Sequence, residues 1–156
     1  MFYKKKKMYM RKLVLFFILI FNQSSFAIEN SQFLILKYDK VNVRYGPGMD
    51  YDVKYIYKKK YLPVKVIDKK DNFRRIVDFK KNSGWIEFSQ LKKGKSFILL
   101  KEEILYSKPT KYSKPLVKIS KGKLLNSKKC QKKWCKIKTD NYSGWIETNY
   151  IWGSIN

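Results

Sequence analysis

The chain has 156 residues, a formal net charge of +24 and no histidine. Its apolar fraction of 44% is ordinary for a globular protein, so the charge does not by itself predict disorder. Without histidine, this chain cannot assemble Ser-His-Asp or Cys-His catalysis or a histidine zinc site, and two cysteines are too few for a four-cysteine zinc site. An enzyme would have to use carboxylates, tyrosines or lysines, and we expect no metal and no cofactor.

The first 27 residues have the three parts of a secretory signal peptide. Six basic and no acidic residues accompany an apolar run from Leu13 to Phe21, and small residues stand at Ser25 and Ala27. As a helix, this run would reach roughly 14 Å, about half of the apolar core of a bilayer. We predict a signal peptide over residues 1–27, cleaved after Ala27, and a periplasmic or extracellular location. An uncleaved amphiphilic anchor is the alternative.

The rest of the chain contains an internal repeat. FLILK at Phe33–Lys37 returns as FILLK at Phe97–Lys101, and SGWIE at Ser83–Glu87 returns unchanged at Ser143–Glu147. The equivalent positions between these anchors are Val43 and Leu105, Pro47 and Pro109, Tyr51 and Tyr112, Phe73 and Trp134, and Ile76 and Ile137. The offset drifts only from 64 to 60, so one module is used twice.

Each half is about 55 to 60 residues long, near the lower limit for a domain with its own core. The segment KKGKS is short, polar and contains a glycine, as linkers do. We predict a first domain over 33–91, a linker over 92–96 and a second domain over 97–153.

Short alternating runs predict strands, and no stretch after residue 27 sustains helical periodicity. Such runs occur at Val41–Val43, Leu62–Val66 and Trp134–Thr139, separated by turn signals. This pattern indicates an all-β barrel or sandwich. In Gly46-Pro47-Gly48-Met49, proline fixes φ at the second position and Gly48 supplies a positive φ at the third, which predicts a type II turn.

Cys130 and Cys135 are the only cysteines and are separated by four residues. In an exported chain this spacing predicts a disulfide across a tight hairpin. A redox-active pair is the alternative, but it usually has a two-residue spacer.

Taken in order, three segments resemble exported bacterial SH3-like proteins with two tandem domains. They are VNVRYGPG at Val41–Gly48, SGWIEFSQL at Ser83–Leu91 and CQKKWCKIKTDNYSGWIETNYIWG at Cys130–Gly153. The resemblance covers about Phe33 to Gly153. It implies two small five-stranded β-barrels and a non-catalytic binding role, often directed to the cell wall or to envelope proteins.

The second closing segment, GWIETNYI, is also similar to the last strand of eukaryotic SH3 domains that bind polyproline. Those domains have a proline where Glu87 and Glu147 stand, and a groove tyrosine where Tyr150 stands. The first repeat has Gln90 at the tyrosine position. Loss of the proline in both halves argues against PxxP recognition.

Aromatic residues are the main binding candidates. Since neighbours in a strand point to opposite faces, Trp85 and Trp145 lie outside if Ile86 and Ile146 enter the barrel. One hypothesis is a shallow platform for a sugar ring or an extended peptide; the other is that the rings close the barrel ends or join the barrels. The candidate ligand-binding residues are Arg44, Tyr45, Tyr51, Trp85, Tyr112, Trp145 and Tyr150.

The expected partners follow from export and charge. We predict recognition of cell-wall glycan or peptide, with an envelope protein partner as the alternative. The lysines also suit binding to an anionic polymer or to a membrane surface. Alternatively, they only form a solvated surface that reflects the composition of the chain. Arginine is scarce after residue 27, so no sequence-specific nucleic-acid binding is expected. Glu87 and Glu147 recur at matching positions, which indicates a role in the fold rather than in glycoside hydrolysis.

Overall fold

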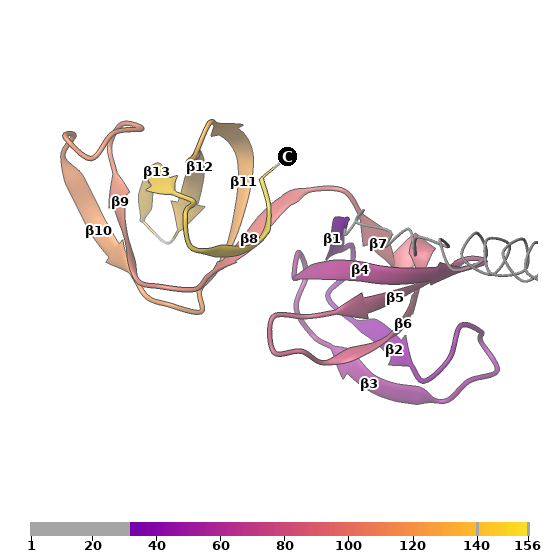
Figure 1. Ribbon diagram of the computed structural model, residues 1–156. Coiled ribbons are helices and arrows are strands. Elements are labelled where there is room, and N and C mark those ends of the chain that lie inside the picture. The colour runs from indigo at the N-terminus through magenta and orange to yellow at the C-terminus, as the bar shows by residue number, and fades with distance from the viewer. Residues whose placement is uncertain (1–31, 140, 156) are drawn as a thin grey trace, which may run out of the picture. The chain divides into compact units, whose positions relative to one another are not determined.

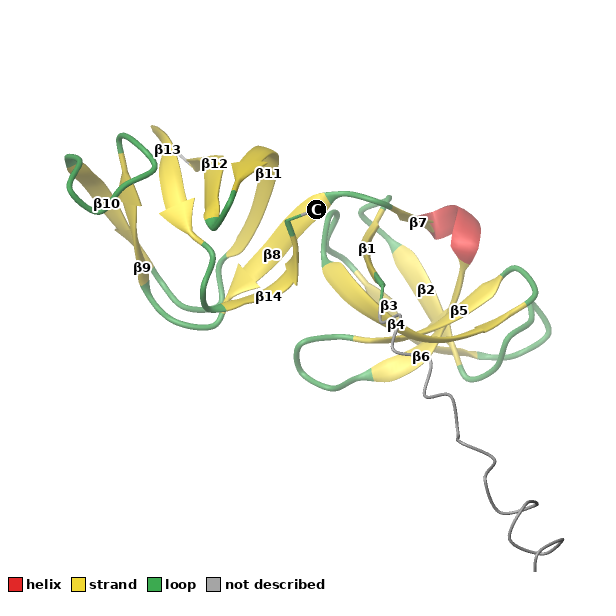
Figure 2. Cartoon of the chain, turned by 45° about the horizontal axis from the view of Figure 1, so that its top comes forward, coloured by secondary structure: helices red, strands yellow, loops and turns green. Residues whose placement is uncertain are grey.

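The computed structural model describes residues 32–139 and 141–155. The predicted signal peptide, residues 1–27, lies outside these residues. The described chain consists of fourteen strands in two sheets, with a single short 3-10 helix, η1 (Phe88–Gln90), between β6 and β7 (Figures 1 and 2). Within the described residues, no helix has the length and apolar character needed to span a membrane.

The first sheet is formed by the first seven strands. They are β1 (Phe33–Leu36), β2 (Val41–Arg44), β3 (Val53–Tyr57), β4 (Pro63–Lys70), β5 (Phe73–Val77), β6 (Ser83–Glu87) and β7 (Leu91–Lys92). Their order in the sheet is β3-β2-β6-β5-β4-β1-β7.

The second sheet is formed by the next seven strands. They are β8 (Lys95–Leu99), β9 (Glu103–Tyr106), β10 (Pro115–Ile119), β11 (Leu124–Gln131), β12 (Trp134–Thr139), β13 (Tyr142–Glu147) and β14 (Ile151–Ser154). Their order is β10-β9-β13-β12-β11-β8-β14, which repeats the first order strand for strand.

This duplicated topology confirms the predicted all-β fold built from one module used twice. Each sheet has seven strands, however, where the resemblance implied five. Five strands, β6-β5-β4-β1-β7, form an antiparallel run, and the hairpin β2–β3 adds to it because β2 pairs with β6. The additional strands are therefore the two arms of the hairpin that carries the Gly-Pro-Gly turn. The second half adds β9 and β10 in the same way.

Each half has its own apolar core, because alternate strand residues point inward. In the first half, Val43, Ile76 and Ile86 are completely buried. Their repeat equivalents include Leu105 and Ile137, which are buried in the second core. The predicted alternation is thus present in both halves.

The glycine of the repeated SGWIE motif lies where two strands approach closely. A side chain on Gly84 would meet the side chain of Val43 and, at 3.0 Å, the carbonyl oxygen of Arg44. A side chain on Gly144 would meet the carbonyl oxygen of Tyr106. Glycine therefore lets β2 in the first half and β9 in the second half approach the motif strand closely.

The first strand of the second half is covered on both faces. Phe97 and Leu99 point into the second core, whereas Ile98 packs into the first core. The Ser96 hydroxyl donates a hydrogen bond to the carbonyl oxygen of Tyr61 at 2.7 Å. Only Lys93 and Gly94 lie between the last strand of one half and the first strand of the next, so β8 already includes part of the segment predicted as a linker.

The Cys130–Cys135 disulfide is confirmed. It joins directly opposed residues of β11 and β12, just before a two-residue turn at Lys132 and Lys133. Lys132 has a φ of 52°, in the left-handed region.

Candidate functional site

In the first half, Arg44, Tyr51 and Trp85 come together beside the Gly-Pro-Gly turn, and Tyr45 follows Arg44 in the chain. Arg44 on β2 pairs directly with Trp85 on β6, so the two side chains share the outer face of the sheet. The guanidinium of Arg44 donates a hydrogen bond from Nη1 to the carbonyl oxygen of Tyr51 at 2.7 Å. Tyr45 is 64% exposed, and the ammonium of Lys54 lies 5.5 Å from the centre of its ring.

The turn itself differs from the prediction. Gly48 does not have a positive φ, so the type II turn expected at Gly46–Met49 is wrong; in the described residues only Gly122 and Gly153 are glycines with positive φ. Instead, the ring of Tyr51 lies against Gly46, where any Cβ would collide with it. The glycine serves to seat an aromatic ring, and Tyr51 consequently has a structural role in the loop.

Trp85 and Trp145 lie on the outer faces, as the alternation predicts. Ile86 and Ile146 are completely buried, whereas both tryptophans are partly exposed. Trp145 pairs with Tyr106 on β9 on one side and with Lys136 on β12 on the other.

Tyr106 is a site residue that sequence reasoning missed. Its ring meets the buried ring of Trp134 edge-on, with centroids 5.8 Å apart. The signal was available in the repeat, since Tyr106 follows Leu105 as Arg44 follows Val43. Where the first half has an arginine beside its tryptophan, the second half has a tyrosine.

Glu147 forms an ion-pair cluster on the same outer face. Its side chain is 4% exposed, and its two carboxylate oxygens lie 2.7 Å from the ammonium groups of Lys111 and Lys133. Hydrogen bonds from these two lysines lower the pKa of Glu147, and the same partnership raises the pKa of Lys111. Partial burial, together with the charge of Glu147, raises the pKa of Glu103.

An open groove of about 240 Å³ lies beside this cluster. It is lined by Glu102, Glu103, Ile104, Tyr106, Lys111 and Lys118. Lys118 pairs with Glu102 at 2.9 Å, so both acidic and basic side chains line the groove.

The remaining candidates lie elsewhere. Tyr112 is completely exposed on the loop between β9 and β10. Tyr150, 47% exposed, lies between β13 and β14, where the ammonium of Lys101 is 3.9 Å from the centre of its ring. The candidate residues therefore do not form one continuous platform.

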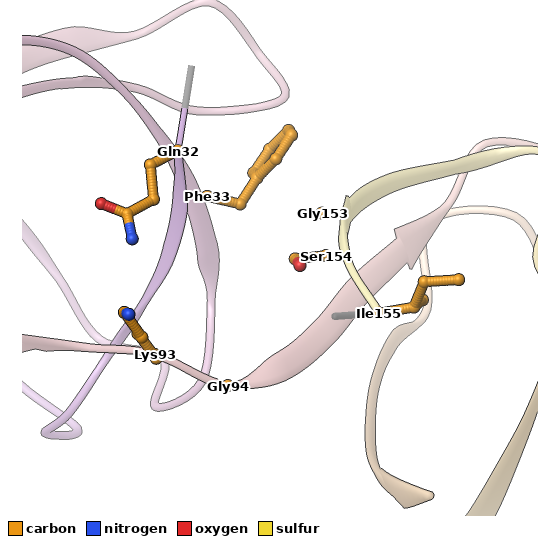
Figure 3. Close-up of a pocket in the computed structure, with 7 residues that line it drawn as sticks. All are labelled: Gln32, Phe33, Lys93, Gly94, Gly153, Ser154 and Ile155. Atoms are coloured by element: carbon orange, nitrogen blue, oxygen red, sulfur yellow. The ribbon is translucent and has the colours of Figure 1, made fainter. Parts of the chain in front are cut away.

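A larger open pocket of about 470 Å³ lies where the two halves meet, and Figure 3 shows its lining. Beside it, the rings of Phe33 and Trp152 meet edge-on, with centroids 5.3 Å apart. Of its seven lining residues only Lys93 is charged, and the remainder are small, amide or apolar. Among the described residues, no cluster of three or more acidic, cysteine or histidine side chains is arranged to hold a metal.

The family model for the bacterial SH3 domain matches two segments, residues 37–93 and 101–153. The chain belongs to the bacterial SH3 domain family. These two matches confirm the tandem resemblance predicted from the sequence. Bacterial SH3 domains are generally non-catalytic, are typically extracellular or envelope-associated, and commonly bind cell-wall material.

Two solved structures similar to this bacterial SH3 protein are NlpC2 and NlpC1 from Trichomonas vaginalis. They are 13% and 14% identical to the chain, each with a TM-score of 0.36. The matches cover 81% and 82% of this chain but only 49% and 48% of those chains, so the protein spans about half their length. A search of curated proteins found no match.

Proposed function

We propose that this bacterial SH3 protein is an exported, non-catalytic binding module that recognises peptidoglycan in the cell envelope. The observation that carries the proposal is the direct pairing of Arg44 with Trp85 on the outer face of the first half, beside the exposed ring of Tyr45 that follows Arg44 in the chain. The export step rests on the signal-peptide pattern at residues 1–27, and the domain limits 33–91 and 97–153 belong to the same proposal.

The chemistry of this face matches both parts of peptidoglycan. Tyr45 and Trp85 offer aromatic surface with a polar edge, on which a sugar ring or an extended peptide can lie. The guanidinium of Arg44 carries five N–H groups, and the Nη1 hydrogen bond to the carbonyl of Tyr51 uses one of them. The other N–H groups remain as donors for a ligand. Together with Lys54, Arg44 places positive charge where carboxylates of a stem peptide would be bound.

The repeated carboxylates, Glu87 and Glu147, support a binding role rather than hydrolysis. Carboxylate catalysis needs two acidic groups that reach the substrate, one of them protonated. Both oxygens of Glu147 are engaged by lysines, its side chain is buried, and its pKa is lowered. Glu87 belongs to the other sheet, so the repeated acids do not form a pair.

Sedimentation with purified sacculi tests the proposal. Tyr45→Ala combined with Arg44→Gln should weaken binding about tenfold, since one ring contact and one charged contact are lost. The matched control is Tyr38→Ala, which removes a 48% exposed tyrosine outside the site and should leave binding unchanged. Moderate salt should be present, so that adsorption through the net charge is screened.

Equal sedimentation of the wild type and the double variant would overturn the assignment of the face. Tyr112→Ala, at a completely exposed position, tests whether the second half also binds. If sacculi are ignored and a defined envelope protein is retained through Tyr45 and Arg44, the protein is an adaptor instead. N-terminal sequencing of the exported protein checks the predicted start after Ala27.

A further inference from the structure

The hairpin of β11 and β12 has an unusual charge. Residues 124–139 contain six lysines and no acidic residue. The equivalent hairpin of the first half, residues 63–77, contains five basic residues and two acidic ones, for a net charge of +3. The same element of the fold is therefore twice as positively charged in the second half.

The register gathers these charges on the outer face. Lys129 lies directly opposite Lys136, which lies opposite Trp145 on the next strand. Lys138 follows on the same face of β12, because alternate residues share a face. Like charges directly opposed in a sheet destabilise it, so this arrangement does not arise from stability.

Most of these ammonium groups are unpaired. Lys133 is bound to Glu147, the buried acid on this face. Within the described residues, the other five exposed lysines of the hairpin form no ion pair. They are Lys128, Lys129, Lys132, Lys136 and Lys138.

The backbone beneath the lysines is rigid. The Cys130–Cys135 disulfide links the residues next to Lys129 and Lys136. The buried hydroxyl of Ser127 lies 2.9 Å from the carbonyl oxygen of Lys129 and 2.6 Å from that of Lys136. Such preorganisation lowers the entropy lost when a ligand binds.

We propose that this lysine face, defined by Lys129, Lys136 and Lys138, binds a polymer with a phosphodiester backbone. Ammonium groups act as compact point charges that accept phosphate in many orientations, as a flexible polymer requires. The hairpin has no exposed large apolar side chain to insert into a bilayer, so a polymer is favoured over a membrane. This is a second ligand and a second face, independent of the peptidoglycan proposal.

The test measures binding of the purified protein to fluorescent poly(glycerol phosphate) by anisotropy at several salt concentrations. The variant Lys129→Gln/Lys136→Gln/Lys138→Gln should weaken binding about tenfold at low salt. The slope of its plot of log affinity against log salt concentration should become less steep by about 2, as expected for roughly three lost phosphate contacts. The matched control, Lys58→Gln/Lys69→Gln/Lys70→Gln, removes the same charge from exposed lysines of the first half and should change binding less than about twofold.

Equal weakening by the two triple variants would overturn the proposal, because it would show attraction by net charge alone. Cosedimentation with phosphatidylglycerol vesicles provides the second arm. If vesicle binding depends on the hairpin lysines and polymer binding does not, the polymer proposal is overturned. The ligand of this face would then be a membrane. Sacculi freed of anionic polymers should bind the hairpin variant as well as they bind the wild type, which separates this test from that of the peptidoglycan face.

Discussion

Glu87 and Glu147 end two identical SGWIE motifs, yet their surroundings are different. Glu147 is buried and held by two lysines. Glu87 is partly exposed and has no ion pair in the described part of the chain. The same five residues therefore form the same strand in both halves, but only in the second half does the glutamate belong to a charged cluster.

The difference comes from residues outside the motif. By the repeat offset, Asp50 and Asn72 occupy the positions of Lys111 and Lys133. The backbone around Asn72 and Lys133 is equivalent, since the amide of Phe88 donates to the carbonyl of Asn72 as the amide of Thr148 does to that of Lys133. A repeated motif thus fixes strand geometry, whereas neighbouring loops decide the chemistry of its side chains.

The first prediction tests whether the halves are equivalent at their cores. Ile76→Ala and Ile137→Ala each remove a buried side chain, and each should lower the stability of its own half by about 2 to 5 kcal/mol. Amide hydrogen exchange, followed separately in β6 and β13, would measure the effect. A large loss of stability in one half with no loss in the other would show that the two cores are not equivalent.

The disulfide makes the second half different from the first. Lys69 and Arg74 are opposed where the second half has Cys130 and Cys135. Cys130→Ala/Cys135→Ala should destabilise the second half by about 2 kcal/mol, because a small closed loop is released in the unfolded chain. Urea unfolding with exchange detection would show the loss in β12 and not in β5.

The repeated glutamates provide the most direct comparison. Glu147→Gln should lower the stability of the second half by about 2 kcal/mol at neutral pH, because two charge-assisted bonds to a buried carboxylate are lost. Glu87→Gln should change stability by less than about 0.5 kcal/mol, as exposed substitutions do. Similar losses for the two variants would contradict the assigned difference.

The pH dependence of stability tests whether the ion pairs of Glu147 cause this difference. Because the folded pKa of Glu147 is lowered, its stabilising contribution is present above the ordinary value of 4.5 and is lost as the pH falls through the folded value. The wild type and Glu147→Gln should therefore converge in stability in acid. A gap that stays constant down to low pH would exclude the ion pairs as its source.

Transfer of the cluster should have the smallest effect. Asp50→Lys/Asn72→Lys places lysines around Glu87 and should stabilise the first half by at most about 1 kcal/mol, since Glu87 is more exposed than Glu147. Thermal unfolding measures the gain. Adding Glu87→Gln to this variant should remove it, and a gain that persists would show that the lysines act elsewhere.

Local sequence patterns predicted much of this protein. The repeat predicted two sheets with the same strand order, the alternation placed Ile86 and Ile146 inside and Trp85 and Trp145 outside, and the cysteine spacing predicted the disulfide. These properties follow from chain periodicity and from contacts between residues close in sequence. The turn at Gly46–Met49 was mispredicted because its geometry depends on a ring that packs back from Tyr51.

Tertiary structure alone decided which side chains meet across strands and loops. It brought Lys111 and Lys133 to Glu147, placed Tyr106 against Trp134 and Trp145, and left Tyr112 fully exposed on a loop. Such contacts join segments from different strands and loops, and sheet register sets them. Composition and periodicity determine the face on which a residue lies, whereas folding determines its neighbours there, because register and loop packing depend on the whole sheet.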